Sequence, residues 1–387
     1  RHELLKAVKG LLPQTVLLAP HRLQTLTQQA LQHQMEHCVR YNLAEPWADL
    51  LQDCYATEER IPSQTVMRLD HHGDEVWFVQ FSHCGKRLAS ASKDRTIAVW
   101  ALDQERPAVV KVLTGHQDSV SFLAWSHDDT RMLSCGNDCT IKLWDMEAAV
   151  CLRNFLGHSE PVTALAWLPG GKRFVSGGCD KKIFTWQVDS TDPIAEHHGE
   201  RVGDLALSAD GSRMVTISPD KRIRIFDLPH MHESTCVADQ ENLTSLSLSA
   251  DGRYLLVNVS SDSRPEIQLW DLEEKLVVRK FSGHKQGRYV IRSCFGGVRD
   301  MLVVCGSEDS QVYIWHRATG ALLRTLQGHA GTINSVAWCP TDPRMFASGS
   351  DDNTVRVWGC PPPAPQHSMP DSGQAAVPQA HHSLSRR

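Results

Sequence analysis

The chain has 387 residues, of which 41% are hydrophobic and 22% are charged, so it can bury a sizeable core. Its 45 acidic residues outnumber its 40 lysines and arginines, and a net charge of −5 gives no electrostatic footprint for nucleic acid. No apolar stretch reaches the length of about 18 residues that indicates a membrane-spanning helix. Composition therefore predicts neither a nucleic-acid nor a membrane partner.

Residues 1–58 carry a helical pattern that differs from the rest of the chain. Between Pro20 and Asn42, apolar residues recur at the 3.6-residue spacing of an amphipathic helix, at Leu23, Leu26, Ala30, Leu31, Met35 and Cys38. Such a helix must bury its apolar stripe, either on the remainder of the chain or on a partner. We therefore expect a short α-helical segment ahead of the main domain.

Aromatic residues then recur at a long, nearly constant period. They follow one another at intervals of 40 to 45 residues, at Trp100, Trp144, Trp186, Phe226, Trp270, Trp315 and Trp358. A period of this length is typical of a β-propeller built from four-stranded blades. The period predicts an all-β domain with seven blades over residues 59–360.

A second repeat supports the first. A histidine lies 22 residues before an aspartate, and the aspartate lies six residues before the aromatic residue, in His72–Asp94–Trp100, His116–Asp138–Trp144, His158–Asp180–Trp186 and His198–Asp220–Phe226. The first interval lengthens to 25 and 23 residues in His284–Asp309–Trp315 and His329–Asp352–Trp358. We expect each set to form a buried hydrogen-bonded chain, with a serine or threonine of the second strand as a further member. A structural role in these hydrogen-bonded chains is a better interpretation of the histidines than catalysis or metal binding.

The fifth repeat and the two ends of the domain depart from the pattern. Asp239 occupies the histidine position of the fifth repeat and Arg264 the aspartate position, so we expect no such chain there. Residues 64–69 precede the first histidine, where a fourth strand would lie, and we infer that they complete the last blade. This would remove the open sheet edges that favour aggregation. Residues 361–387, rich in Pro, Ser, Gln and Ala, are predicted to be disordered.

The chain offers no convincing catalytic, cofactor or metal site. None of its twelve cysteines forms a Cys-x-x-Cys pair, and Cys135 and Cys139 lack a second pair that would complete a zinc site. Reduced, buried thiols favour the cytoplasm, with the nucleus as an open alternative. No Gly-x-x-x-x-Gly-Lys phosphate loop is present. We expect a protein that is not an enzyme and holds no cofactor.

Charged loop residues indicate where partners would bind. The loops between blades and those between second and third strands gather on one rim, and their candidate partner-binding residues are Asp74, Glu75, Lys93, Asp118, Glu160, Glu200, Lys285, Arg288, Glu308 and Asp351. An acidic arc opposite the basic pair of the sixth blade could hold a segment of uneven charge, although these could also be ordinary solvated charges. Arg292 stands where other blades carry Phe78, Phe122, Ala164 and Ser335, either as a paired, partly buried cation or lining the central channel.

Several segments resemble the WD repeat-containing protein 26 family, particularly its plant and algal forms. They are residues 75–82 (EVWFVQFS), 290–297 (VIRSCFGG), 306–317 (GSEDSQVYIWHR) and 347–359 (ASGSDDNTVRVWG), together with the helix at 21–42 (HRLQTLTQQALQHQMEHCVRYN). The resemblance extends over nearly the whole chain up to Gly359. Generic WD repeats would not share the strand IRSCFGG.

The resemblance implies a WD-repeat subunit of a multi-subunit RING-type ubiquitin ligase, the CTLH or GID assembly. Its propeller would scaffold the complex or recruit substrates for proteasomal degradation, without catalysing transfer itself. Implied partners are LisH/CTLH ligase subunits, including a Ran-binding-protein-type scaffold and RING subunits, and substrate proteins. Residues 1–58 would be the distal part of a CTLH-type module, and a LisH segment that could mediate oligomerisation is missing, so we expect a truncated chain.

Two alternatives remain open. The chain could be a substrate receptor of a cullin-based ligase, but the Trp-Asp-x-Arg box of such receptors is absent, because Glu147 and Glu273 stand where the arginine would be. Residues 11–26 could be interpreted as a degenerate F-box, although they match the CTLH-type linker better. A general WD-repeat signalling scaffold is the other possibility.

Overall fold

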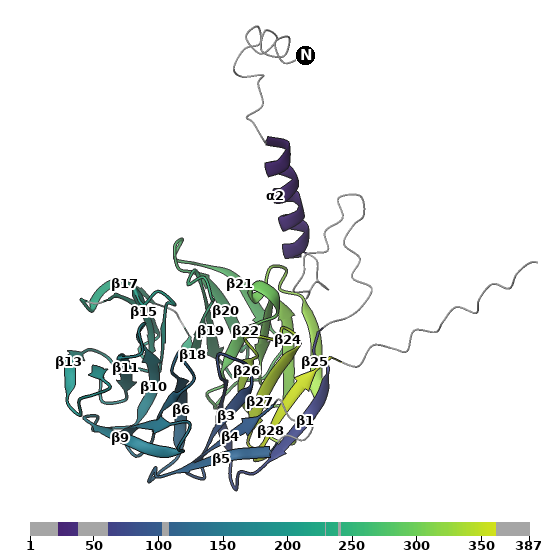
Figure 1. Cartoon of the computed structure of the whole chain (residues 1–387). Helices are drawn as coiled ribbons and strands as arrows, with labels where there is room; N and C mark the ends of the chain where they lie inside the picture. The colour runs from purple at the N-terminus through teal and green to yellow at the C-terminus, as the bar shows by residue number, and fades with distance from the viewer. Residues whose placement is uncertain (1–21, 38–60, 103–107, 229, 239–240, 361–387) are drawn as a thin grey trace, which may run out of the picture.

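A computed structural model describes residues 22–37, 61–102, 108–228, 230–238 and 241–360 of the chain. Seven four-stranded antiparallel sheets are arranged around a ring, which confirms the seven-bladed propeller (Figure 1). The helix α2, Arg22–His37, precedes the ring, and its described apolar side chains Leu23 and Leu26 are 75% and 44% exposed. The expected disordered tail lies outside the described residues, as do most of residues 1–58.

Six blades are built from four consecutive strands each. Blade one contains β2–β5 (Val76–Phe81, Arg87–Ser92, Thr96–Ala101, Ala108–Thr114), and blade two contains β6–β9 (Val120–Trp125, Arg131–Gly136, Thr140–Asp145, Val150–Leu156). Blade three contains β10–β13 (Val162–Trp167, Arg173–Gly178, Lys182–Gln187, Pro193–His198), and blade four contains β14–β17 (Asp204–Leu207, Arg213–Ser218, Arg222–Asp227, His232–Ala238).

Blade five contains β18–β21 (Asn242–Leu248, Tyr254–Ser260, Glu266–Asp271, Leu276–Ser282), and blade six contains β22–β25 (Ser293–Gly296, Leu302–Cys305, Gln311–His316, Leu322–Gln327), with the short 3₁₀ helix η1 (Val298–Asp300).

The seventh blade joins the two ends of the domain. It contains β26 (Ile333–Trp338), β27 (Met345–Ser350) and β28 (Thr354–Gly359), and its outer strand is β1 (Gln64–Asp70). β1 pairs antiparallel with β28, with Leu69 opposite Val355, and Figure 1 shows the purple β1 beside the yellow β28. The segment that the sequence assigns to closing the ring therefore lies at the edge of the last blade.

The core of the ring lies between the blades rather than at one centre. The middle strands of a blade are buried on both faces, because each blade packs against two neighbours; in β7, five consecutive residues from Met132 are buried. The outermost strand β9 is mostly exposed, with Phe155 as its buried anchor. Within the described residues, each boundary between two blades holds its own apolar cluster. Stability is thus distributed around the ring.

Every outermost strand carries a register shift beside the aromatic residue of its blade. The shift lies at Trp100, Trp144, Trp186, Phe226, Trp270 and Trp315 in blades one to six, and between Thr65 and Met67 opposite Trp358 in blade seven. An extra residue in one strand increases local twist and interrupts the ladder. The shifts thus make the exposed edges poor templates for pairing with another chain.

Candidate functional site

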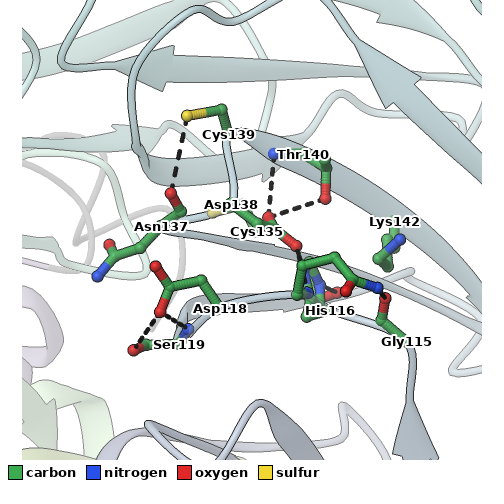
Figure 2. A network of polar contacts seen from close by, with 12 residues as sticks. Gly115, His116, Asp118, Ser119, Cys135, Asn137, Asp138, Cys139, Thr140 and Lys142 are labelled. Carbon is green, nitrogen blue, oxygen red and sulfur yellow. Dashed lines mark hydrogen bonds and ion pairs between the residues drawn. The ribbon is translucent and has the colours of Figure 1, made fainter.

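Blade two contains the full hydrogen-bonded chain expected from the sequence. Asp138 Oδ2 lies 2.8 Å from His116 Nδ1, His116 Nε2 lies 2.7 Å from Ser134 Oγ, and the Trp144 indole donates to the same oxygen at 2.7 Å. Figure 2 shows His116 and Asp138, with Thr140 donating to the aspartate through both its backbone N–H and its hydroxyl. The indole donates a hydrogen bond to serine, serine donates to imidazole, and imidazole donates to the carboxylate, so every polar group of the chain is satisfied.

Blades one, three and seven repeat this chain. The distance from the histidine Nδ1 to the aspartate is 2.9, 3.0 and 2.9 Å in His72–Asp94, His158–Asp180 and His329–Asp352. The central serine oxygen bonds both the imidazole and the indole in Ser90–Trp100, Ser176–Trp186 and Ser348–Trp358. The same hydrogen-bonded chain therefore holds a turn in each of four blades.

The protonation states fit a structural role. Burial alone would raise the pKa of the aspartates, but the hydrogen bonds that they accept from histidine and from the turn outweigh it. The pKa therefore lies below the usual range in Asp94, Asp138 and Asp352. Burial lowers the pKa of His158 and His329, which favours neutral imidazole. A neutral ring can donate on one side and accept on the other, as the chain requires.

The prediction for blade four is wrong. The His198 side chain is 72% exposed, and its Nε2 lies 3.1 Å from Glu196 Oε1 instead of bonding Asp220. Asp220 is instead bound by Arg224, whose guanidinium also donates to Ser218 Oγ at 2.7 Å. Arg224 thus takes the place of the histidine on the aspartate, whereas the position of the central serine, ten residues before Phe226, is held by Thr216. Phe226 is buried but has no N–H to donate, so the chain has no indole end.

The prediction for blade six is also wrong. His284 is buried, yet neither of its ring nitrogens makes a hydrogen bond in the described structure. Asp309 accepts from the Tyr313 hydroxyl at 2.8 Å, and the Trp315 indole donates to the Ser282 carbonyl. Cys305 stands ten residues before Trp315, where blades one, two, three and seven have the central serine. Without that hydroxyl and with Asp309 already occupied, burial lowers the pKa of His284 to about 4.

Blade five has no such chain among its described residues. The Trp270 indole donates to Gln268 Oε1 at 2.9 Å, and Arg264 engages the turn through its backbone N–H to Ser261. Asp239 lies outside the described residues. Asn258 instead bonds Gln286, Ser293 and Cys305, which ties the blade to its neighbour.

A cavity of about 350 Å³ opens at the centre of one rim. Six different blades contribute a lining residue at or beside their innermost strand: Trp77, Ser121, Thr163, Gly203, Arg292 and Asn334. The innermost strands contact one another around the ring, and β2 contacts β26. The cavity is therefore the mouth of the central channel, on the rim that carries the histidine loops.

Two of the predicted rim residues line this mouth. Glu75 accepts from the Trp77 indole at 2.9 Å and from Lys93 Nζ at 2.9 Å, and Asp74 lies 3.7 Å from the same ammonium. Asp351 accepts from Asn334 Nδ2 at 2.6 Å, and burial raises the pKa of its carboxyl. Two carboxylates and one ammonium thus face the cavity edge together.

The other rim candidates lie elsewhere. Glu308 faces inward, where one carboxylate oxygen accepts the backbone N–H groups of Gly287, Arg288 and Tyr289 at 2.9 to 3.1 Å. Glu308 therefore stabilises the loop before β22, and this carboxylate oxygen is already occupied by backbone hydrogen bonds. The remaining candidates are exposed on the rim and do not line the mouth: Asp118, Glu160, Glu200, Lys285 and Arg288.

The apolar part of the mouth was missed by the sequence reasoning. Tyr289 and Val290, each 52% exposed, stand on the loop that Glu308 braces and line the cavity with Trp77. The available signal was the apolar pair inside an otherwise polar, lengthened loop. Together these residues give the mouth an apolar wall beside its acidic edge.

Arg292 also lines the mouth. Its guanidinium pairs with the buried Asp204 of blade four, and its central carbon lies 5.3 Å from the Phe78 ring and 4.8 Å from the Phe122 ring. Burial raises the pKa of Asp204, although the arginine opposes that shift. Both interpretations of Arg292 therefore hold, since it is a paired, partly buried cation that also lines the channel.

The described residues contain no group of three His, Cys, Asp or Glu side chains placed to hold a metal ion. Nine cysteines of the described residues are free thiols; Cys135, Cys305 and Cys339 are buried, as expected, but Cys84 and Cys151 are exposed. The described helix lacks the length and apolarity to cross a membrane.

Six segments match the family model described as WD domain, G-beta repeat: residues 63–101, 108–145, 149–187, 191–227, 275–316 and 320–359. A WD repeat-containing protein 26 homolog of Arabidopsis thaliana is 39% identical over 93% of this chain and 61% of its own length. The WD repeat-containing protein WDS homolog of the same plant is 42% identical, over 93% and 69%. GID complex subunit 7 of Schizosaccharomyces pombe is 37% identical, over 92% and 70%.

The chain belongs to the WD repeat-containing protein 26 family. It spans less than two thirds of the length of the first of these relatives. The stretch between two of the matched repeats, residues 228–274, contains the first three strands of blade five, β18, β19 and β20, and blade five lacks the expected hydrogen-bonded chain among its described residues.

Proposed function

We propose that this chain is a non-catalytic WD-repeat subunit of a GID/CTLH-type ubiquitin ligase, which recruits substrate proteins at the central mouth and supports their proteasomal degradation. The relation to GID complex subunit 7 supports the assembly. The observation that carries the recruiting role is the mouth itself, an open cavity with an apolar wall and an acidic edge. Such a surface suits a protein segment that combines an apolar side chain with positive charge.

The ligase partners in this proposal are LisH/CTLH subunits, a Ran-binding-protein-type scaffold and RING subunits, acting in the cytoplasm and in the nucleus. Affinity purification of the full-length protein followed by mass spectrometry tests the assembly. Recovery of LisH/CTLH and RING proteins supports it. Recovery of cullin adaptors alone would contradict it and favour a receptor of a cullin-based ligase, whereas signalling proteins alone would favour a general scaffold.

A paired set of variants tests the mouth. Glu75→Gln with Asp351→Asn removes two charges at the cavity edge, and Glu160→Gln with Glu200→Gln removes two charges elsewhere on the same rim. We expect the first pair to lower substrate recovery at least tenfold while ligase subunits are retained, because only the mouth contacts substrates. The second pair should leave both unchanged. Equal recovery of substrates by both pairs would eliminate the mouth as the docking surface.

A further inference from the structure

A second cavity, of about 420 Å³, opens between blades five and six. Its lining comes from the turn that leads into β19 and from the turn that joins β24 to β25. Antiparallel strands alternate in direction, so the turns after the first and third strands of a blade share one rim. This cavity therefore lies on the rim opposite the central mouth. Three arginines line it: Arg253, Arg279 and Arg317.

Each guanidinium is held in place by a specific contact. The Arg317 guanidinium carbon lies 5.2 Å from the centre of the Tyr254 ring, a cation–π contact. Arg279 donates from one terminal nitrogen to the Ala318 carbonyl at 2.7 Å, and its stem packs over Gly320, where a Cβ would lie only 3.1 Å from Arg279 Cδ. These contacts restrict the side chains before any ligand arrives, which lowers the entropy cost of binding.

Three arginines and one carboxylate line the cavity. Arg253 is paired with Asp271, at 2.9 Å from both its Nε and a terminal nitrogen, and its Nε also lies 3.7 Å from Glu273. Arg279 and Arg317 have no carboxylate within ion-pair distance among the described residues. Asp251 is the acid in the lining, and it already accepts from the Ser249 hydroxyl and the Arg253 backbone N–H. Among the lining residues, two guanidinium groups without an ion pair therefore face one carboxylate.

We infer that Arg279 and Arg317 bind a phosphate group, carried as a monoester. A planar guanidinium presents parallel N–H donors that match two phosphate oxygens. A phosphate monoester carries nearly two negative charges at pH 7, so as a ligand it balances two unpaired arginines better than a single carboxylate group would. Tyr254, Leu269 and Val278 line the same cavity and offer contact to the carbon group that bears the ester. The phosphate could be carried by a phosphorylated protein side chain or by a small metabolite.

Calorimetric titration of the full chain separates these sources. The probes are O-phosphoserine, inorganic phosphate, a short phosphoserine peptide and the same peptide without phosphate. Binding of the phosphopeptide more tightly than of O-phosphoserine supports a protein source, and equal binding supports a small molecule. No binding of any phosphorylated probe, or equal binding of the unphosphorylated peptide, would overturn the inference.

Variants locate the site. Arg279→Gln with Arg317→Gln should weaken binding of the phosphorylated probe at least tenfold, and Arg279→Lys, which keeps the charge but loses the fork, should have a smaller effect. Arg173→Gln is the matched control, since Arg173 is an exposed arginine at the same rim in blade three. Melting temperatures of all variants monitor folding. Unchanged affinity in the folded double variant would also overturn the inference, and so would an equal loss in the control.

Discussion

Ser134 illustrates what one side chain contributes to a blade. Its hydroxyl lies between the His116 imidazole and the Trp144 indole and bonds both. In blade six, Cys305 occupies the equivalent position, and its thiol accepts from Asn258 instead. A thiol is a weak hydrogen-bonding group, so the histidine of that blade is left without a partner. The Ser-to-Cys difference, together with the Tyr313 hydroxyl that occupies Asp309, thus leaves the imidazole of blade six without a hydrogen bond.

The isolated His284 should make stability sensitive to acid. Its pKa is about 4 in the folded chain and 6.5 when unperturbed, so the unfolded state takes up the proton first as the pH falls. The free energy of unfolding should therefore fall between pH 6.5 and pH 4, by about 3 kcal/mol from this residue alone. His284→Leu should remove that part of the slope when urea unfolding is followed at several pH values.

His198→Leu is the matched control, because the His198 side chain is 72% exposed. It should leave the pH dependence of the parent protein unchanged. A parallel pH profile for His284→Leu and the parent would show that the buried imidazole does not titrate as the structure requires. The lowered pKa of His158 and His329 acts in the same direction and remains in both variants.

The histidine and aspartate spacing could predict four of these chains but not the two failures. Spacing along the sequence fixes which residues reach the same turn, and this is sufficient where serine completes the set. It does not reveal that Arg224 competes for Asp220, or that Tyr313 competes for Asp309. Those competitors lie on the third strand, and only side-chain geometry brings their polar ends to the aspartate.

At the level of elements, β1 closes the ring. Leu69 on this strand is 2% exposed and packs in the cluster between blades seven and one, whereas Val66 on the same strand is 57% exposed. Leu69→Ala should lower the free energy of unfolding by about 2–5 kcal/mol, because it leaves a cavity at that boundary. Val66→Ala should change it by about 0.5 kcal/mol or less. Chemical denaturation followed by tryptophan fluorescence measures both.

A similar loss in the two variants would mean that β1 is held by its backbone pairing rather than by its buried anchor. The strand itself could be predicted, since residues 64–69 fill the only place for a fourth strand beside β28. Its register shift between Thr65 and Met67 could not, because a shift depends on how two backbones pair and leaves no fixed residue pattern.

At the level of the whole molecule, Arg292 connects four blades. It extends from blade six to Asp204 in blade four and stacks on aromatic rings from blades one and two. Arg292→Met should destabilise the fold by about 3–5 kcal/mol, because Asp204 would remain buried without its cation. Adding Asp204→Asn removes that charge but keeps an oxygen for the Leu246 backbone N–H, and should restore part of the loss.

The four-member cycle of parent, two single variants and double variant measures the coupling between these residues. Purely additive effects in urea unfolding would show that the ion pair does not hold the channel together. The central mouth above Arg292 could not be predicted from the sequence. Trp77 and Tyr289 are more than two hundred positions apart, and only closure of the ring places them around one cavity.

The adjacency of β1 and β28 also means that the ring has no obligatory starting point. The Ser63 backbone N–H donates to the Gly359 carbonyl at 2.9 Å, so the two termini of the domain are already neighbours. A short linker between residues 360 and 61 would therefore allow the chain to be cut in any exposed inter-strand turn. Circular permutants should keep all seven blades, with the order of synthesis changed and the packing preserved.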